Sequence, residues 1–244
     1  MSHRSHRIAL CLSGQPRNII PGFHSTKKSI IDGNNVDVFI HTWHDPSKAG
    51  QSWDRQINNG NKPVIFPDNL EQTVKDSYNP IIIVFENPKD FSYPKEVLPV
   101  DGYIINDEHR RDYNDPVWRG RQLSQMYSVH QANLLKKEFE NALGFKYDLV
   151  IRARFDLKYN HVISLKNRNP DVFHIPDRPH DELADKFAFS SSANMDYYSE
   201  IYLHIENYVM KGVLPSMHAG LTEHLKGREI SFFTGHNSIS ILRN

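Results

Sequence analysis

The sequence predicts an α/β fold of the Rossmann type, in which helices flank a mostly parallel central sheet. The first observation is a strand–helix–strand pattern at 8–12, 22–31 and 36–41, which places two parallel strands side by side. The second is a long helical segment, 117–143, that leads into another buried strand. Hydrophobic residues make up 39% of the chain, enough for a substantial core, so we expect one domain over 1–244.

The first two predicted strands end in loops with binding chemistry. The apolar run 8–12 stops at Ser-Gly-Gln-Pro-Arg, which consists of small, turn-forming and basic residues. The helix at 22–31 returns the chain, and the second strand, 36–41, stops at Thr42 and Trp43. Ligands of open parallel sheets bind at the edge where the strands end. We therefore expect both loops to lie at one ligand-binding edge.

The rest of the chain alternates loops with further elements. The polar, proline-rich stretch 47–116 is expected to be mainly surface loop, with a strand at 80–85 and a short one at 103–105. The helix at 117–143 ends at a glycine and delivers the chain to the strand segment 148–158. The remaining predicted elements are short strands at 173–175 and 187–190, a helix at 195–209, and a helix–strand pair ending near Phe233.

Composition limits the partners of this chain. Lys plus Arg and Asp plus Glu each number 29, so no overall charge draws the protein to nucleic acid or to an anionic membrane. An anionic ligand therefore requires a local site. The single cysteine, Cys11, lies inside an apolar strand, which favours a buried thiol over a nucleophile. No apolar run reaches the length of a membrane span, and we expect a soluble, cytoplasmic protein without a transmembrane segment.

The segment 148–158 has an unusual end for a strand. Its apolar residues give way to Arg152, Arg154 and Asp156. Burying two guanidinium groups and a carboxylate is costly unless they pair with one another or face a charged ligand. Because residues two apart share a strand face, a ladder of salt bridges explains the pattern as well as a binding site does. The residue types alone leave both interpretations open.

Four motifs stand in order along the chain, at 7–17, 36–43, 146–156 and 185–198. The third, Lys-Tyr-Asp-Leu-Val-Ile-Arg-Ala-Arg-Phe-Asp after a long helix, resembles the central segment of GT-A glycosyltransferases, where a strand ends in an Asp-x-Asp metal site. The first two resemble the opening strands of such enzymes from bacterial polysaccharide clusters and large DNA viruses. The fourth is similar to the strand and helix that close the acceptor side. The resemblance spans most of the chain.

This resemblance implies a GT-A-like Rossmann-type sandwich that transfers a sugar from a nucleotide-sugar donor to a glycan or another hydroxyl acceptor. It implies a nucleotide-binding half at about 7–158 and an acceptor-side half at about 159–244. Where many relatives carry Asp-x-Asp, this chain has Arg154-Phe-Asp156, which leaves Asp156 to hold Mn²⁺ or Mg²⁺. Alternatively, Arg154 replaces the metal and neutralises the diphosphate directly. We favour metal-assisted transfer, and expect Asp156→Ala to remove it without loss of stability.

The residues expected to contact the nucleotide follow the first two strands or begin the long helix: Ser13, Gly14, Arg17, His41, Thr42, Trp43, Arg121 and Gln122. Arg17 is expected to reach the diphosphate and, with Arg154, to stabilise its charge as it leaves. Trp43 is suited to pack on a base or a sugar, and is explained equally well as a core residue. Gly14 either contacts the nucleotide or only shapes the turn.

Inverting sugar transfer also needs a carboxylate or an imidazole that takes the proton of the acceptor hydroxyl. The candidates are Asp185, His218 and Glu223, all downstream of the expected metal strand. Related enzymes begin the late helix with a carboxylate, whereas this chain has Pro-Ser-Met-His-Ala-Gly-Leu-Thr-Glu at 215–223. The sequence therefore leaves the base unassigned.

Two other classes of function compete with this interpretation. A sulfotransferase-like enzyme would also use a basic cleft for a phosphorylated donor, but the first strand is followed by no Gly-x-x-x-x-Gly-Lys-Ser/Thr phosphate loop. A carbohydrate-binding module without catalysis explains the aromatic residues but not the arginines and the aspartate at the end of 148–158. Nucleotide-sugar transfer accounts for both features.

Overall fold

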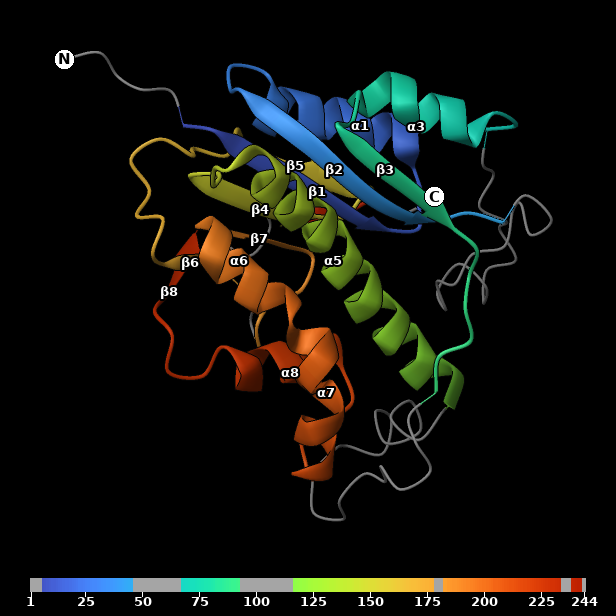
Figure 1. Cartoon of the computed structure of the whole chain (residues 1–244), viewed down its shortest axis with the longest axis vertical. Helices are drawn as coiled ribbons and strands as arrows, with labels where there is room; N and C mark the ends of the chain where they lie inside the picture. The colour runs from blue at the N-terminus through green and yellow to red at the C-terminus, as the bar shows by residue number, and fades with distance from the viewer. Residues whose placement is uncertain (1–5, 46–66, 93–115, 178–181, 234–237, 243–244) are drawn as a thin grey trace.

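The computed structural model contains a seven-stranded sheet with the strand order β3-β2-β1-β4-β7-β6-β8 (Figure 1). Strands β5 and β9 form a separate two-stranded sheet. The described residues are 6–45, 67–92, 116–177, 182–233 and 238–242. The strands are β1 (Ile8–Gly14), β2 (Val36–Trp43), β3 (Ile82–Glu86), β4 (Leu149–Ala153), β5 (Leu157–Tyr159), β6 (Phe173–Pro176), β7 (Phe187–Ser190), β8 (Ile230–Phe233) and β9 (Ile239–Ile241).

Strand pairing makes one half of the large sheet fully parallel. Strand β1 lies between β2 and β4 and runs parallel to both, and β3 runs parallel to β2. Strand β7 is antiparallel to β4 and to β6, and β8 is parallel to β6. The predicted α/β fold with a mostly parallel sheet is confirmed. The carboxyl ends of β1 to β4 consequently lie at one edge, where ligands of such sheets bind.

Helices cover both faces of the sheet (Figure 1). Alternating residues of β1 explain the two layers: Ile8 and Leu10 point into one hydrophobic cluster, and Ala9 and Cys11 into the other. Helix α1 (Ile19–Thr26), its π-helical continuation η1 (Lys27–Ile31) and α3 (Leu70–Tyr78) cover the first face. The second is covered by α5 (Pro116–Leu143), α6 (Ser192–Ser199), α7 (Ile201–Met210) and α8 (Met217–His224).

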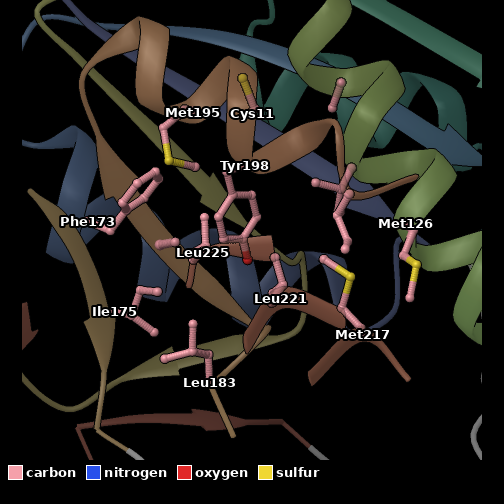
Figure 2. Packing of buried hydrophobic residues seen from close by; sticks show 14 of the residues in the cluster. Cys11, Met126, Phe173, Ile175, Leu183, Met195, Tyr198, Met217, Leu221 and Leu225 are labelled. Carbon is pink, nitrogen blue, oxygen red and sulfur yellow. The ribbon is translucent and has the colours of Figure 1, made fainter. Parts of the chain in front are cut away.

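The cluster beneath α5 to α8 contains the only cysteine. Figure 2 shows the Tyr198 ring in the middle of the labelled apolar side chains, among them Leu221 and Leu225. Cys11 belongs to this cluster, and burial raises the pKa of its thiol to about 12. The thiol is therefore protonated near neutral pH, and the prediction that Cys11 is a buried hydrophobe is confirmed. None of the helices in the described ranges has an apolar stretch long enough to cross a membrane.

Four sequence predictions of local structure differ from the structure. The helix expected at 22–31 begins at Ile19 and changes to π-helical spacing at Lys27. The helix expected at 195–209 is two helices, α6 and α7, because the chain bends at Glu200. The segment 148–158 is also divided, since the chain turns after β4 and β5 pairs with β9 instead. Helix α3 occupies part of the expected loop; the strand expected at 103–105 lies outside the described residues.

Gly22 allows α1 to pack closely on the turn that follows β4. A Cβ atom on Gly22 would lie 1.9 Å from the backbone carbonyl oxygen of Phe155. Because this obstacle is backbone, it cannot rotate away. We expect Gly22→Ala to lower the free energy of unfolding by about 1–3 kcal/mol, although alanine favours helices. Urea denaturation measures the change, and the exposed His24→Ala in the same helix is the control; equal stability of the two variants would disprove the close approach.

His224 connects α6, α7 and α8 through bonds that need a neutral ring. Its Nε2 donates to the carbonyl oxygen of Tyr197 at 2.7 Å, and its Nδ1 accepts from the Tyr208 hydroxyl at 2.9 Å. The ring also stacks on Tyr197, with centroids 4.2 Å apart. Burial lowers the pKa of His224 from 6.5 to about 4. A charged His224 would lose the bond from Tyr208.

This lowered pKa gives an expected pH dependence of stability. The unfolded chain binds the proton more readily than the folded one, so the stabilisation is complete above pH 6.5 and is lost as the pH falls towards 4. Urea titrations at several pH values should show a steeper decline in this window for the wild type than for His224→Gln. Parallel declines in the two proteins would show that His224 does not titrate in this way.

Candidate functional site

A pocket of about 610 Å³ opens where the parallel strands end. This volume is within the range of small-molecule sites, about 300–1,000 Å³. Its walls come from the loop after β1, the end of β2, the segment after β3, the first turns of α5 and the end of β4. The loop after β1 and the end of β2 thus lie at one edge of the sheet, as predicted.

Most of the residues predicted for the nucleotide site line this pocket. They are Ser13, Gly14, Arg17, Trp43, Arg121 and Gln122, together with Arg154 from the end of β4. The pocket is also lined by Lys89, Phe91, Gln125 and Arg152, which were not among the expected nucleotide contacts. Lys89 and Phe91 lie in the proline-rich stretch after β3, which has no period that predicts a site. The position of Arg152 did indicate a special role, because an arginine buried in a strand needs a charged or hydrogen-bonding partner.

His41 and Thr42 lie behind the pocket wall and hold its first loop. The Thr42 hydroxyl donates to the carbonyl oxygen of Gly14 at 2.9 Å. The amide of Gly14 donates to Ser128 Oγ at 2.8 Å, and Ser128 Oγ lies 2.9 Å from His41 Nδ1. Gly14 has a φ of 101°, in the left-handed region that favours glycine. His41 and Thr42, which were expected to contact the nucleotide, therefore do not line the pocket but fix its first loop.

His41 is held in one protonation state by its neighbours. Its Nε2 lies 2.8 Å from Glu86 Oε2, and a carboxylate only accepts, so Nε2 carries the hydrogen. Burial lowers the pKa of His41 and outweighs the bond to Glu86, so the ring is neutral near pH 7. Its Nδ1 is then an acceptor for the Ser128 hydroxyl. This chain of bonds connects β1, β2, β3 and α5 beneath the pocket, and fixes Gly14 before any ligand arrives.

Asp156 forms a buried ion pair with two arginines of the pocket wall. Arg154 donates through Nε and Nη2 to the two carboxylate oxygens, at 2.8 and 2.7 Å. Arg17 Nη2 lies 3.3 Å from Asp156 Oδ2. Burial alone would raise the pKa of Asp156, but the charges of Arg154 and Arg17 hold it below its ordinary value. The carboxylate is therefore ionised, and the guanidinium groups stand between it and the pocket.

Arg152 brings a third guanidinium group to the same wall. It is only 2% exposed, and it donates through Nη1 to the carbonyl oxygen of Asp185. Within the part of the chain that the structure describes, its Nε has no hydrogen-bond partner, and the same holds for the buried Ser13 Oγ. Among the described residues, five cationic side chains and one carboxylate, Asp90, line the pocket, so this part of its wall favours an anionic ligand.

Trp43 forms the aromatic part of the wall. Its ring stacks on Tyr127, with centroids 5.6 Å apart and planes at 21°, and Phe91 meets its edge at 5.8 Å. Trp43 is 7% exposed, so it is a core residue, as one of the two sequence interpretations predicts, and it also lines the pocket. A rigid indole at this place offers a surface to a base or a sugar.

Asp185 and His218, two of the three candidate bases, lie together beside the pocket. Asp185 Oδ2 accepts from the pocket residue Gln125 at 2.6 Å, and His218 Nε2 lies 3.6 Å from Asp185 Oδ1. Burial alone would raise the pKa of Asp185, but the charges of His218, Arg152 and Arg154 hold it far below the usual range. Asp185 is therefore ionised and weakly basic.

Glu223, the third candidate base, does not line the pocket. It lies near the far end of α8 from His218, and its carboxylate pairs with Lys226 at 3.3 Å on the surface. At the near end of α8, the Met217 amide donates to Gln122 of the pocket wall at 3.0 Å. The start of α8, and not Glu223, is thus the part of this helix that reaches the pocket.

Models of protein families give no match to this chain, and neither do curated protein sequences. The chemistry of the pocket is therefore inferred from its own side chains. These comprise guanidinium groups from β4, α5 and the loop after β1, a tryptophan at the end of β2, and glutamines on α5.

The residues around Asp156 do not fit the divalent cation expected there. Within the described ranges, no three His, Cys, Asp or Glu side chains converge on one point. Both oxygens of Asp156 already accept charge-assisted bonds from Arg154, and Arg17 contacts one of them. A cation at this carboxylate would displace these bonds and would lie beside two positive charges. The arginines occupy the place that the sequence interpretation gave to Mn²⁺ or Mg²⁺.

The last described strand, β9, completes the wall of the pocket. Ile241 lines it, and the amide of Leu242 donates to the carbonyl oxygen of Asp156 at 2.8 Å. Asn18, in the loop after β1, donates through Nδ2 to the carbonyl oxygen of Leu242 at 2.9 Å. The backbone beside the ion pair of Asp156 with Arg154 and Arg17 is therefore held in place by hydrogen bonds with Leu242.

Proposed function

We propose that this protein is a glycosyltransferase with a GT-A-type fold, which moves a sugar from a nucleotide-sugar donor to a hydroxyl group of a glycan or another acceptor. The observation that carries the proposal is the convergence of Arg17, Arg121, Arg152 and Arg154 on one pocket at the carboxyl edge of the parallel strands. Guanidinium groups suit the oxygens of a diphosphate, and Trp43 suits the flat base or the sugar. The order of the sequence motifs supports the same class.

In this proposal, one group of residues takes the acceptor proton, and another group stabilises the leaving diphosphate. The acceptor oxygen attacks the anomeric carbon, and the bond from that carbon to the diphosphate oxygen breaks, with its electron pair going to the diphosphate. The acceptor proton passes to a base. His218 is the candidate, because it lies with Asp185 next to Gln125 of the pocket wall and Asp185 itself is a weak base. The arginines stabilise the charge on the leaving diphosphate.

A ligand panel tests this function. Nucleoside diphosphates and nucleotide sugars should raise the melting temperature more than nucleoside monophosphates or free sugars do, because ligands that bind only the folded state stabilise it. The nucleotide sugar with the largest shift should release its nucleoside diphosphate when acceptor glycans are added. A shift with 3′-phosphoadenosine phosphosulfate alone would indicate sulfate transfer instead. A shift with oligosaccharides alone would indicate a carbohydrate-binding module.

A further inference from the structure

We infer that guanidinium groups, and not a divalent cation, hold and neutralise the donor diphosphate, and that Asp156 is a positioning residue which aims Arg154 and Arg17 at it. This inference rests on the proposed function, since it concerns the same pocket. It assigns to Arg17, Arg152 and Arg154 the role that a metal has in enzymes with an Asp-x-Asp motif. The ligand class is an inorganic or organic diphosphate.

The first support is the order of the charges around the pocket. The side chain of Asp156 is 3% exposed, while those of Arg154 and Arg17 are 19% and 15% exposed. Both arginines line the pocket, whereas Asp156 stands behind them. A bidentate bond fixes the plane of the Arg154 guanidinium group, which a single contact would not do. The carboxylate thus orients the cations.

The second support is a set of buried polar atoms that the described part of the protein leaves unsatisfied. Arg152 Nε and Ser13 Oγ both lack a hydrogen-bond partner there, and both residues line the pocket. Leaving such an atom buried without a partner costs about 1–3 kcal/mol. Because both residues line the pocket, a bound diphosphate would bring acceptor oxygens to this part of the wall. Ser13, in β1, lies four positions before Arg17, and Arg152, in β4, lies two positions before Arg154.

The same arrangement accounts for the chemical step without a metal. When the bond between the anomeric carbon and the diphosphate breaks, negative charge increases on the leaving oxygen. Preorganised cationic donors stabilise this charge in the transition state. Arg154 and Arg17 are held in advance by Asp156, and Arg152 is held by the carbonyl oxygen of Asp185. The base takes the acceptor proton, and the diphosphate leaves as an anion that the arginines stabilise.

The test uses inorganic pyrophosphate as the probe and isothermal titration calorimetry as the readout. The wild-type protein in EDTA should bind pyrophosphate at least as tightly as it does with Mn²⁺ in place of EDTA. Arg154→Lys should weaken this binding about 10- to 100-fold, because one two-point contact between charged groups is lost. Arg168→Lys, outside the pocket, should bind as the wild type does. Binding that needs Mn²⁺ would overturn the inference.

Asp156→Asn separates a positioning role from the alternatives. If Asp156 only added negative charge near the anion, its removal would tighten pyrophosphate binding; if it only bound a metal, binding in EDTA would not change. We expect binding in EDTA to weaken about tenfold, because the two arginines lose their alignment. Tighter or unchanged binding by a folded Asp156→Asn variant would contradict the positioning role. If Asp156→Asn does not fold, Asp156→Glu replaces it: this variant keeps the charge but shifts the carboxylate, so binding in EDTA as tight as that of the wild type would contradict the positioning role.

These results also distinguish the inference from the proposed function. Donor binding and sugar transfer that both require Mn²⁺ would leave the glycosyltransferase intact and overturn the arginine assignment. Metal-free pyrophosphate binding without release of nucleoside diphosphate from any nucleotide sugar would support the arginine site and overturn the transferase. Transfer that continues at its full rate in EDTA supports both.

Discussion

In the proposed sugar transfer, Arg154→Lys is expected to reduce the rate by about 100-fold, while the protein remains folded. Lysine keeps the positive charge, but it cannot form the planar two-point contacts of a guanidinium group with a carboxylate or a phosphate. Arg154 makes such a contact with Asp156 and lines the pocket. The substitution should therefore weaken the stabilisation of the charge on the leaving diphosphate more than it destabilises the fold.

Single-turnover rates at saturating donor isolate this chemical step from binding. The donor is the nucleotide sugar that the ligand panel selects, and Arg168→Lys is the matched control because Arg168 contacts the Ser164 carbonyl oxygen at the surface. Circular dichroism spectra confirm that each variant is folded. Full activity in both Arg154→Lys and Arg154→Ala would show that Arg154 serves only a structural ion pair.

Asp156→Ala is expected to lower the free energy of unfolding by about 3–5 kcal/mol, the usual cost of removing one partner from a buried ion pair. This reverses the expectation from the sequence, which treated Asp156 as a carboxylate at a loop edge. The residue is 2% exposed and pairs with two arginines, both mostly buried. Without Asp156, the positive charges of Arg154 and Arg17 would repel each other, and no carboxylate would hold the two side chains in place.

Urea denaturation measures this loss, and Asp32→Ala is the control. Asp32 pairs with Lys27 at the surface, where an ion pair contributes about 0–1 kcal/mol. Adding Arg154→Met to Asp156→Ala should recover part of the stability, because the uncompensated charge is then removed as well. A loss in Asp156→Ala no greater than that in Asp32→Ala would show that the ion pair contributes little.

The parts of the fold that follow from the sequence are those with strong local patterns. Strands β1, β2 and β4 are short apolar runs bounded by turn residues, and α5 repeats apolar residues near helical spacing over 28 residues. The sequence does not predict helix α3, because its nine residues follow a polar stretch and include few apolar side chains. The pairing of β5 with β9 depends on contacts between distant segments, which no local pattern predicts.

The pocket was predictable to the same extent. Ser13, Arg17, Trp43 and Arg154 follow strands whose order was clear, so their shared edge could be inferred. His41 and Thr42 belong to the same strand end, but Trp43 lies farther along it and takes the place on the wall. Whether Asp156 faces a metal or an arginine depends on side-chain geometry across three segments. A sequence pattern gives the residue types in such a site but not their partners.

The bond from Asn18 to Leu242 has a consequence for how the protein becomes competent to bind. These residues are separated by 224 positions, and bringing such distant segments together has a loop-closure entropy cost that other contacts must offset. The parallel strands and their helices contain the arginines, yet the wall beside Asp156 is incomplete until β9 docks. A chain that ends before β9 would therefore keep the arginines but lack this part of the pocket wall, and it should bind the ligand more weakly.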